Sequence, residues 1–83
     1  MEKELIIKND HGLHARPAAL FVQTAAKFKS NVDIESHGKR VNGKSILSIL
    51  SLGLNKNDLI KLIVSGPDDK TAFDQLEKIL NGE

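Results

Sequence analysis

A histidine and an arginine stand two positions apart in the segment Gly12–Ala18, whose sequence is GLHARPA. The neutral imidazole of His14 is a nucleophile, and the guanidinium of Arg16 can pair with two phosphate oxygens at once. Pro17 favours the first turn of a helix, where a missing N–H costs nothing. Backbone N–H groups in such a turn lack intrahelical partners and attract anions. The segment therefore predicts a phosphoryl site at a helix N-terminus, formed by His14 and Arg16 with Pro17 and Ala18 in the first turn.

Two other interpretations of this histidine remain open from spacing alone. His14 could be a surface residue that merely caps a helix, because a helix N-terminus is not by itself a site. Metal binding by His11, His14 and His37 is disfavoured, since no motif spacing links the three. The chain has no cysteine and no serine in a nucleophile-elbow pattern, so a Cys- or Ser-based catalytic triad is not supported.

Hydrophobic periodicity predicts seven elements in the order β-α-β-β-α-β-α. Strands are expected over residues 3–8, 32–35, 39–42 and 58–65, where apolar residues alternate with polar ones. Helices are expected over 17–28, over 46–52 and from the GPDD turn at 66–69 through residue 80. Half-polar strands interleaved with helices indicate an α+β fold with an antiparallel sheet covered by helices on one side.

Composition excludes several classes of protein. The 83 residues are enough for one domain spanning 1–83. Twelve basic and eleven acidic residues nearly cancel, and three Phe with no Trp or Tyr make nucleic acid an unexpected partner. No apolar run approaches the roughly 20 residues of a membrane span, and the charged start MEKELIIKND does not resemble a signal peptide. We therefore expect a soluble cytoplasmic protein.

The segment around Ser45 predicts a capped helix with an apolar surface. A serine directly before a short helix commonly provides an N-cap hydroxyl. The following residues, ILSILSL, place apolar side chains around most of the helix, and one layer of core can bury only one face. We expect Ile46, Leu47 and Leu50 to stay exposed near His14 as a docking surface for a partner. The alternative is that these side chains only fill the core.

Residues 38–45, GKRVNGKS, match the P-loop pattern of nucleotide-binding proteins. That pattern normally joins a strand to a helix in a parallel sheet. Here its first glycine falls in an expected hairpin turn and its middle in an expected strand, so nucleotide binding is disfavoured.

With these motifs in view, the sequence resembles the HPr family of histidine phosphocarriers of the bacterial sugar phosphotransferase system. The stretch GLHARPA at 12–18 is similar to the active-site signature of the family. The stretch 44–47, KSIL, followed by SLG at 51–53, is similar to its signature around a regulatory serine. The expected element order fits the family over essentially the whole chain.

The resemblance implies a two-layer open-faced sandwich, with a four-stranded antiparallel sheet of order 1-4-2-3 covered on one face by three helices. It implies that His14 receives a phosphoryl group on Nδ1 from phospho-enzyme I and passes it to IIA domains of sugar permeases. Arg16 would stabilise the group in transfer. The protein would be a phosphocarrier rather than a stand-alone catalyst, without a cofactor or metal, and most simply a monomer.

The resemblance also implies that Ser45 is a regulatory phosphorylation site in relatives from low-GC Gram-positive bacteria. The partners there are HPr kinase/phosphorylase and, for the phosphoserine form, catabolite control protein A. A purely regulatory module acting through phospho-Ser45 is the alternative, which the presence of His14 disfavours. One departure is His11 directly before Gly12, close to where many relatives carry a small polar cap. This second imidazole could alter phosphoryl transfer or simply be a solvated loop residue.

Overall fold

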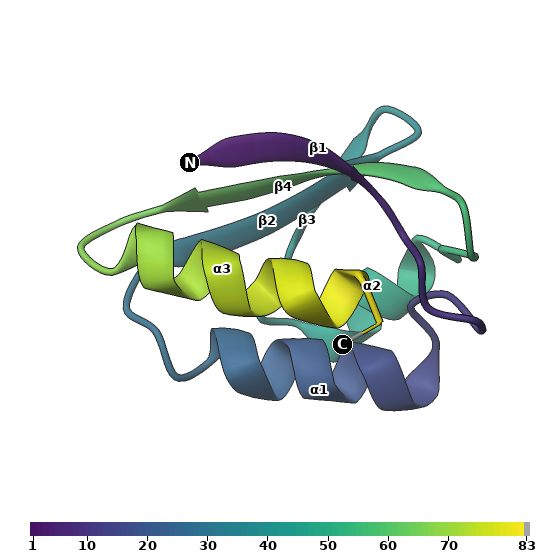
Figure 1. The fold of residues 1–83 in the computed structure, drawn as a ribbon, viewed down its shortest axis with the longest axis horizontal. Helices are drawn as coiled ribbons and strands as arrows, with labels where there is room; N and C mark the ends of the chain where they lie inside the picture. The colour runs from purple at the N-terminus through teal and green to yellow at the C-terminus, as the bar shows by residue number, and fades with distance from the viewer. Residues whose placement is uncertain (83) are drawn as a thin grey trace.

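Four strands and three helices follow one another in the predicted order in the computed structural model, which describes residues 1–82 (Figure 1). The elements and their bounds are β1 (Glu2–Ile6), α1 (Ala15–Ala25), β2 (Asn31–Ser36), β3 (Lys39–Asn42), α2 (Ile46–Ser51), β4 (Leu59–Ser65) and α3 (Asp69–Leu80).

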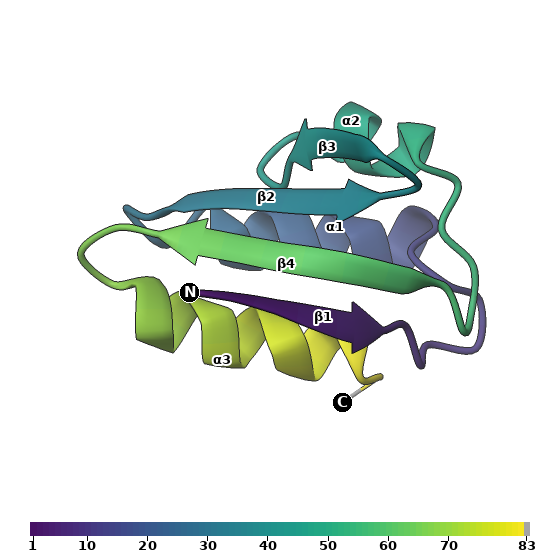
Figure 2. The ribbon, with the colours of Figure 1, turned by 90° about the horizontal axis from the view of Figure 1, so that it is seen from above.

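The strands form one antiparallel sheet of order β1-β4-β2-β3. The two long helices, α1 and α3, run under this sheet, and α2 lies near its β3 edge (Figures 1 and 2). Among residues 1–82, no helix lies on the opposite face of the sheet. The expected α+β open-faced sandwich and its strand order are therefore confirmed.

Strand alternation explains why the helices pack on one face only. In β4, Ile60, Leu62 and Val64 are buried, whereas Lys61 between them is only half-buried on the uncovered side. The buried side chains of the sheet and helices form one apolar cluster, in which Phe21 of α1 is fully enclosed. Burial of this cluster is the main force that brings the two layers together.

The N-terminal strand and helix differ at their ends from the sequence prediction. Strand β1 ends at Ile6 because the chain then leaves the ladder and Lys8 N–H donates to Leu80 O at 3.0 Å. Helix α1 begins at Ala15, two residues before Pro17, and ends at Ala25. Its expected continuation to residue 28 is replaced by tighter bonds, such as Phe28 N–H to Ala25 O at 3.2 Å.

The start of α3 also differs, since Pro67 lies before the N-cap residue Asp68 rather than in the first turn. The Asp68 carboxylate makes no cap bond to its own helix. It accepts instead from the Ser30 hydroxyl and from the backbone N–H groups of Lys29 and Ser30. These bonds, the Ser30 hydroxyl foremost, lower the pKa of Asp68 against the opposing effect of burial. They join the start of α3 to the connection that follows α1.

No helix in residues 1–82 is long and apolar enough to cross a membrane. Within the same residues, no three His, Asp or Glu side chains gather in a way that could hold a metal ion.

Candidate functional site

His14 is the N-cap residue of α1, which confirms its expected place at the start of a helix. Its backbone is extended, with φ −93° and ψ −165°, and its exposed ring makes no cap hydrogen bond to the helix. Ala18 N–H donates to His14 O at 2.8 Å and so closes the first helical turn. The imidazole is therefore accessible to solvent, and none of its atoms is used to cap the helix.

The first turn of α1 leaves two backbone donors free. Among residues 1–82, neither the N–H of Ala15 nor that of Arg16 makes a hydrogen bond. Pro17 is the third helical residue rather than the first, and it has no N–H to offer. Two unpaired N–H groups at the positive end of a helix favour an anion. An anion bound there would lie next to the His14 residue.

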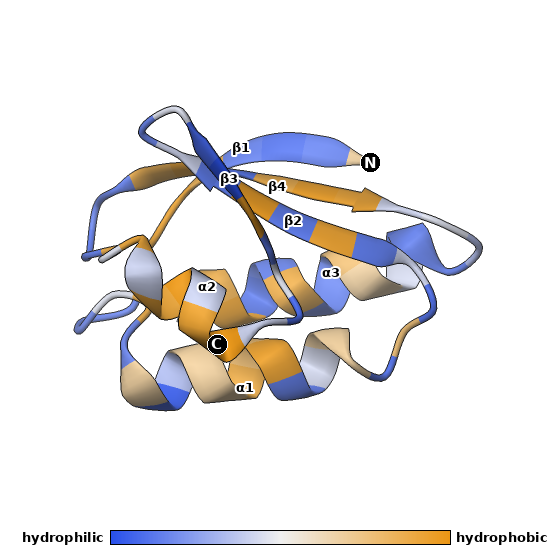
Figure 3. Ribbon diagram, turned by 180° about the vertical axis from the view of Figure 1, so that it is seen from behind, coloured by the Kyte–Doolittle hydropathy of each residue, from blue (hydrophilic) through white to orange (hydrophobic). Residues whose placement is uncertain are grey.

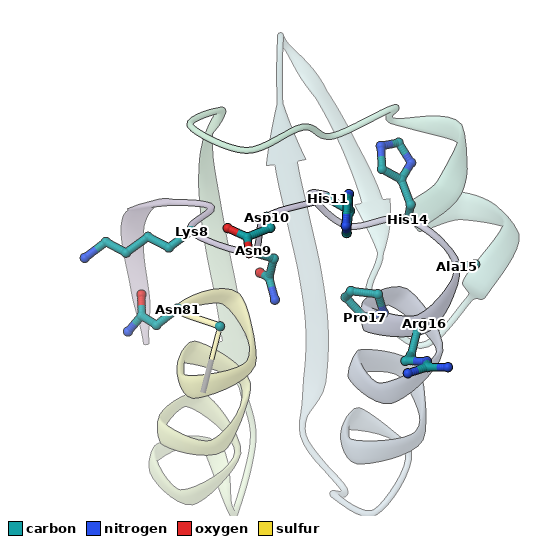
Figure 4. Close-up of a pocket in the computed structure, with 10 residues that line it drawn as sticks. Lys8, Asn9, Asp10, His11, His14, Ala15, Arg16, Pro17 and Asn81 are labelled. Atoms are coloured by element: carbon teal, nitrogen blue, oxygen red, sulfur yellow. The ribbon is translucent and has the colours of Figure 1, made fainter.

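Arg16 is not brought against His14. Its side chain is exposed and makes no hydrogen bond or ion pair with any residue from 1 to 82. Figure 4 shows its guanidinium beside the first turn of α1, pointing away from the His14 ring. A role for Arg16 with a phosphoryl group therefore requires its long side chain to rotate toward the ring.

An open depression of about 580 Å³ lies beside this turn (Figure 4). It joins the loop after β1, the first turn of α1 and the residues after α3. Its lining residues are Lys8, Asn9, Asp10, His11, His14, Ala15, Arg16, Pro17, Asn81 and Gly82. The side chain of Asn9 holds the loop to the end of α3 by donating to Ile79 O at 3.0 Å. His11 is exposed in this depression, so both interpretations of the second imidazole stay open.

Gly12 brings a second loop against the histidine. Its φ is +68°, and a Cβ there would lie 2.2 Å from Leu54 O and 2.7 Å from the Cα of Asn55. Leu13 N–H donates to Leu54 O at 3.1 Å. Only glycine permits both this left-handed backbone and this close approach. The contact places Asn55 next to His14, where its Oδ1 is 3.2 Å from Nε2 of the ring.

Asn55 is the site neighbour that the sequence reasoning missed. It stands 41 positions after His14, in the loop between α2 and β4, and belongs to no recognised motif. The only signal was Gly53, which predicts the end of a helix and hence a loop in this region. Nothing in that signal says which loop residue reaches the imidazole.

Ser45 caps α2 as predicted, since its Oγ accepts from Ser48 N–H at 3.3 Å.

The P-loop pattern at 38–45, which ends at Ser45, forms no phosphate loop. Gly38 lies in the hairpin turn, and residues 39–42 form β3 of an antiparallel pair. The Lys44 ammonium donates to Phe28 O at 2.7 Å, so it is already used within the fold.

Three side chains of α2 form an exposed surface, which we call the apolar patch. Ile46 is 36 % exposed, Leu47 77 % and Leu50 39 %, while Ile49 is fully buried. The expected exposure is confirmed, and core filling does not account for these three side chains. Figure 3 shows that residues of high hydropathy are frequent in α2 and in the neighbouring part of α1. Leu20 of α1, 47 % exposed, is a further apolar surface residue that the sequence reasoning did not select.

Comparisons with known proteins found relatives that match nearly the whole chain. A family model described as "PTS HPr component phosphorylation site" matches residues 1–82. The phosphocarrier protein HPr of Buchnera aphidicola is 48 % identical over 79 residues, covering 95 % of this chain and 93 % of that one. The HPr-like protein Crh of Halalkalibacterium halodurans is 43 % identical over 83 residues, covering 100 % of this chain and 99 % of the relative.

Solved structures show the same fold. The crystal structure of HPr-C-His from Thermoanaerobacter tengcongensis superposes with a TM-score of 0.91 at 46 % identity, covering 100 % of this chain and 97 % of that one. A structure of an HPr dimer from the same organism has a TM-score of 0.79 at 47 % identity, covering 94 % of this chain and 90 % of the other.

Proposed function

Because the chain belongs to the HPr family of phosphotransferase-system phosphocarriers, we propose that His14 accepts a phosphoryl group on Nδ1 from phospho-enzyme I and passes it to IIA domains of sugar permeases. The observation that carries this proposal is the exposed imidazole at the start of α1, beside two backbone N–H groups without acceptors. The protein acts as a phosphocarrier whose partners supply the rest of each active site.

The chemistry needs little beyond a nucleophile and charge stabilisation. The lone pair of Nδ1 forms the bond to phosphorus, while the bond between phosphorus and the carrying group of enzyme I breaks and its electron pair stays with enzyme I. The N–H groups of Ala15 and Arg16, which make no hydrogen bond within residues 1–82, would donate to phosphoryl oxygens. The Arg16 guanidinium, which has no ion-pair partner in residues 1–82, rotates to neutralise part of the charge.

Labelling by enzyme I tests the acceptor residue directly. The protein is incubated with enzyme I and phosphoenolpyruvate, and acid-labile protein-bound phosphate is measured. His14→Ala should abolish the label. His11→Ala is the matched control, because it removes an exposed imidazole from the same depression, and it should keep the label. A label that survives His14→Ala would refute the assignment.

Regulation through Ser45 is a second proposal, favoured by the 43 % identity to an HPr-like protein Crh. HPr kinase/phosphorylase would phosphorylate the Oγ that caps α2, and the phosphoserine form would bind catabolite control protein A. The new charge lies beside Ile46, the first residue of the apolar patch, and should weaken binding to enzyme I. Ser45→Ala should block labelling by the kinase and spare the relay; labelling of this variant would exclude Ser45 as the target.

We assign the apolar patch of Ile46, Leu47 and Leu50 to docking of enzyme I and IIA domains, because exposed apolar side chains mark contact surfaces.

We further propose a single cytoplasmic domain over 1–83 that works as a monomer, since both partners need the same face. Light scattering at working concentration tests the monomeric state, and a dimer in solution would refute it, as a structure of an HPr dimer exists for the Thermoanaerobacter protein.

A further inference from the structure

The amide of Asn55 has only one orientation that satisfies both of its neighbours. Its Nδ2 donates to Gly53 O at 3.3 Å, which a carbonyl oxygen could not do. Its Oδ1 therefore faces Nε2 of His14 at 3.2 Å. An amide oxygen can only accept, so the ring nitrogen must be the donor. In the neutral ring a proton on Nε2 leaves the lone pair on Nδ1.

We infer that Asn55 is a positioning residue that fixes the tautomer and orientation of His14, so that Nδ1 is the free nucleophile. This inference rests on the proposed phosphocarrier function, and it adds why one ring nitrogen and not the other takes the phosphoryl group.

Asn55 can serve in this way because its own position is fixed. Its backbone N–H donates to Asp58 Oδ2 at 2.8 Å, and its O accepts from Asp58 N–H at 3.1 Å. The bond from Leu13 N–H to Leu54 O and the close approach of Gly12 hold this turn against the residues before His14. The acceptor is thus in place before any partner binds.

The hydrogen bond should strengthen as the reaction proceeds. When the Nδ1 lone pair forms the bond to phosphorus, the proton on Nε2 stays where it is. The ring then carries positive charge shared between the two nitrogens. A charged N–H makes a stronger hydrogen bond than a neutral one, so Oδ1 of Asn55 stabilises the phosphorylated ring more than the free ring.

Two measurements on three variants test the inference. The ring tautomer of unphosphorylated His14 is read from its nitrogen chemical shifts by NMR, and phosphoryl acceptance is timed with catalytic enzyme I and phosphoenolpyruvate. Asn55→Ala removes the oxygen that accepts from Nε2. Asn55→Asp keeps an accepting oxygen on a side chain of the same shape. Asn31→Ala is the matched control, because Asn31 is an exposed asparagine at the start of β2 whose side chain makes no hydrogen bond to residues 1–82.

Asn55→Ala should move the tautomer ratio toward that of free imidazole and lower the acceptance rate by about five- to tenfold. Asn55→Asp should keep the proton on Nε2. Its carboxylate favours the imidazolium, so the pH profile of acceptance should shift upward. All variants share the other titratable and charged groups of these two loops and of the first turn of α1, which are Lys8, Asp10, His11, Arg16, Lys56 and Asp58. A shift in the profile therefore belongs to residue 55.

The outcomes separate the two proposals. An unchanged tautomer ratio in Asn55→Ala, or a rate equal to that of Asn31→Ala, would overturn the role of Asn55 and leave the carrier function intact. If even the unaltered protein takes no phosphate from enzyme I, the proposed function fails. The tautomer measurement still decides whether Asn55 orients the ring, because it needs no phosphate.

Discussion

Replacing Gly12 by alanine should damage both the fold and the site, because this residue is where the two site loops touch. The added Cβ would lie 2.2 Å from Leu54 O, about 1 Å inside an ordinary contact. The obstacle is backbone rather than a flexible side-chain end, so the loop at 53–58 must retreat.

The cost can be estimated from three parts. Holding alanine at φ +68° costs about 1–2 kcal/mol. Forcing the two backbones apart costs roughly 1–3 kcal/mol, as in other overpacked sites. Losing the bond from Leu13 N–H to Leu54 O costs about 1 kcal/mol. We therefore expect Gly12→Ala to lower the free energy of unfolding by roughly 3–6 kcal/mol, measured by urea denaturation.

Gly38→Ala is the matched control for the backbone part. Gly38 has φ +76°, but nothing lies within 4 Å of the Cβ that it would gain. The free energy of unfolding of Gly38→Ala should fall by only about 1–2 kcal/mol, which is the cost of the left-handed backbone. Equal losses in the two variants would show that Gly12 does not touch the second loop, and would refute the close approach on which the position of Asn55 depends.

The same pair of variants links stability to function. In Gly12→Ala the retreat of the second loop lengthens the distance from His14 Nε2 to Asn55 Oδ1, so phosphoryl acceptance should slow. Measured at a temperature where both variants are folded, Gly38→Ala should keep the original rate. Normal acceptance by a folded Gly12→Ala would contradict the coupling between these loops.

Three further predictions concern other parts of the molecule. Ser45→Ala should cost about 1 kcal/mol of unfolding free energy in urea through loss of the α2 cap, and an unchanged midpoint would contradict the cap. Leu47→Ala should leave stability within about 0.5 kcal/mol but weaken enzyme I binding in calorimetry; equal affinity would exclude it from docking. Because the folded-state pKa of Asp68 is lowered, its stabilisation is present above the carboxyl's unfolded pKa and is lost as pH falls through the folded value. Asp68→Asn should flatten the loss of stability on acidification, whereas Asp74→Asn, at an exposed position on α3, should not; identical acid profiles would refute the role of Asp68.

The elements of the fold were predictable because each carries a local pattern. Alternation in 58–65 identified β4 as a strand. Gly53, which predicts a helix end, and the hydroxyl of Ser45, which predicts a helix start, bounded the short helix α2. The strand order came from the resemblance to a family, since no local pattern says that β1 pairs with β4. The start of α1 was missed because Pro17 fits the third helical position as well as the first.

The site was predictable where its parts are adjacent in sequence and unpredictable where they are not. His14 and the first turn of α1 lie within one short segment, so their chemistry could be read from residue types. Asn55 is 41 positions away and depends on a backbone contact at Gly12. The direction in which the Arg16 side chain points could not be predicted from the sequence either, because a long exposed side chain has several rotamers of similar energy.

A carrier must hold its phosphoryl group for a time and then release it, and the geometry of this site suits that requirement. The site at the start of α1 consists of two backbone N–H donors, an exposed imidazole and a guanidinium that points away from the imidazole. None of these is a buried charge, so a phosphohistidine here would gain only modest stabilisation from its own chain. A partner that docks on the apolar patch would exclude water from the same region and strengthen every charge interaction there. The affinity of the site for phosphate would thus depend on which protein covers it, which is the property that allows transfer from one partner to the next.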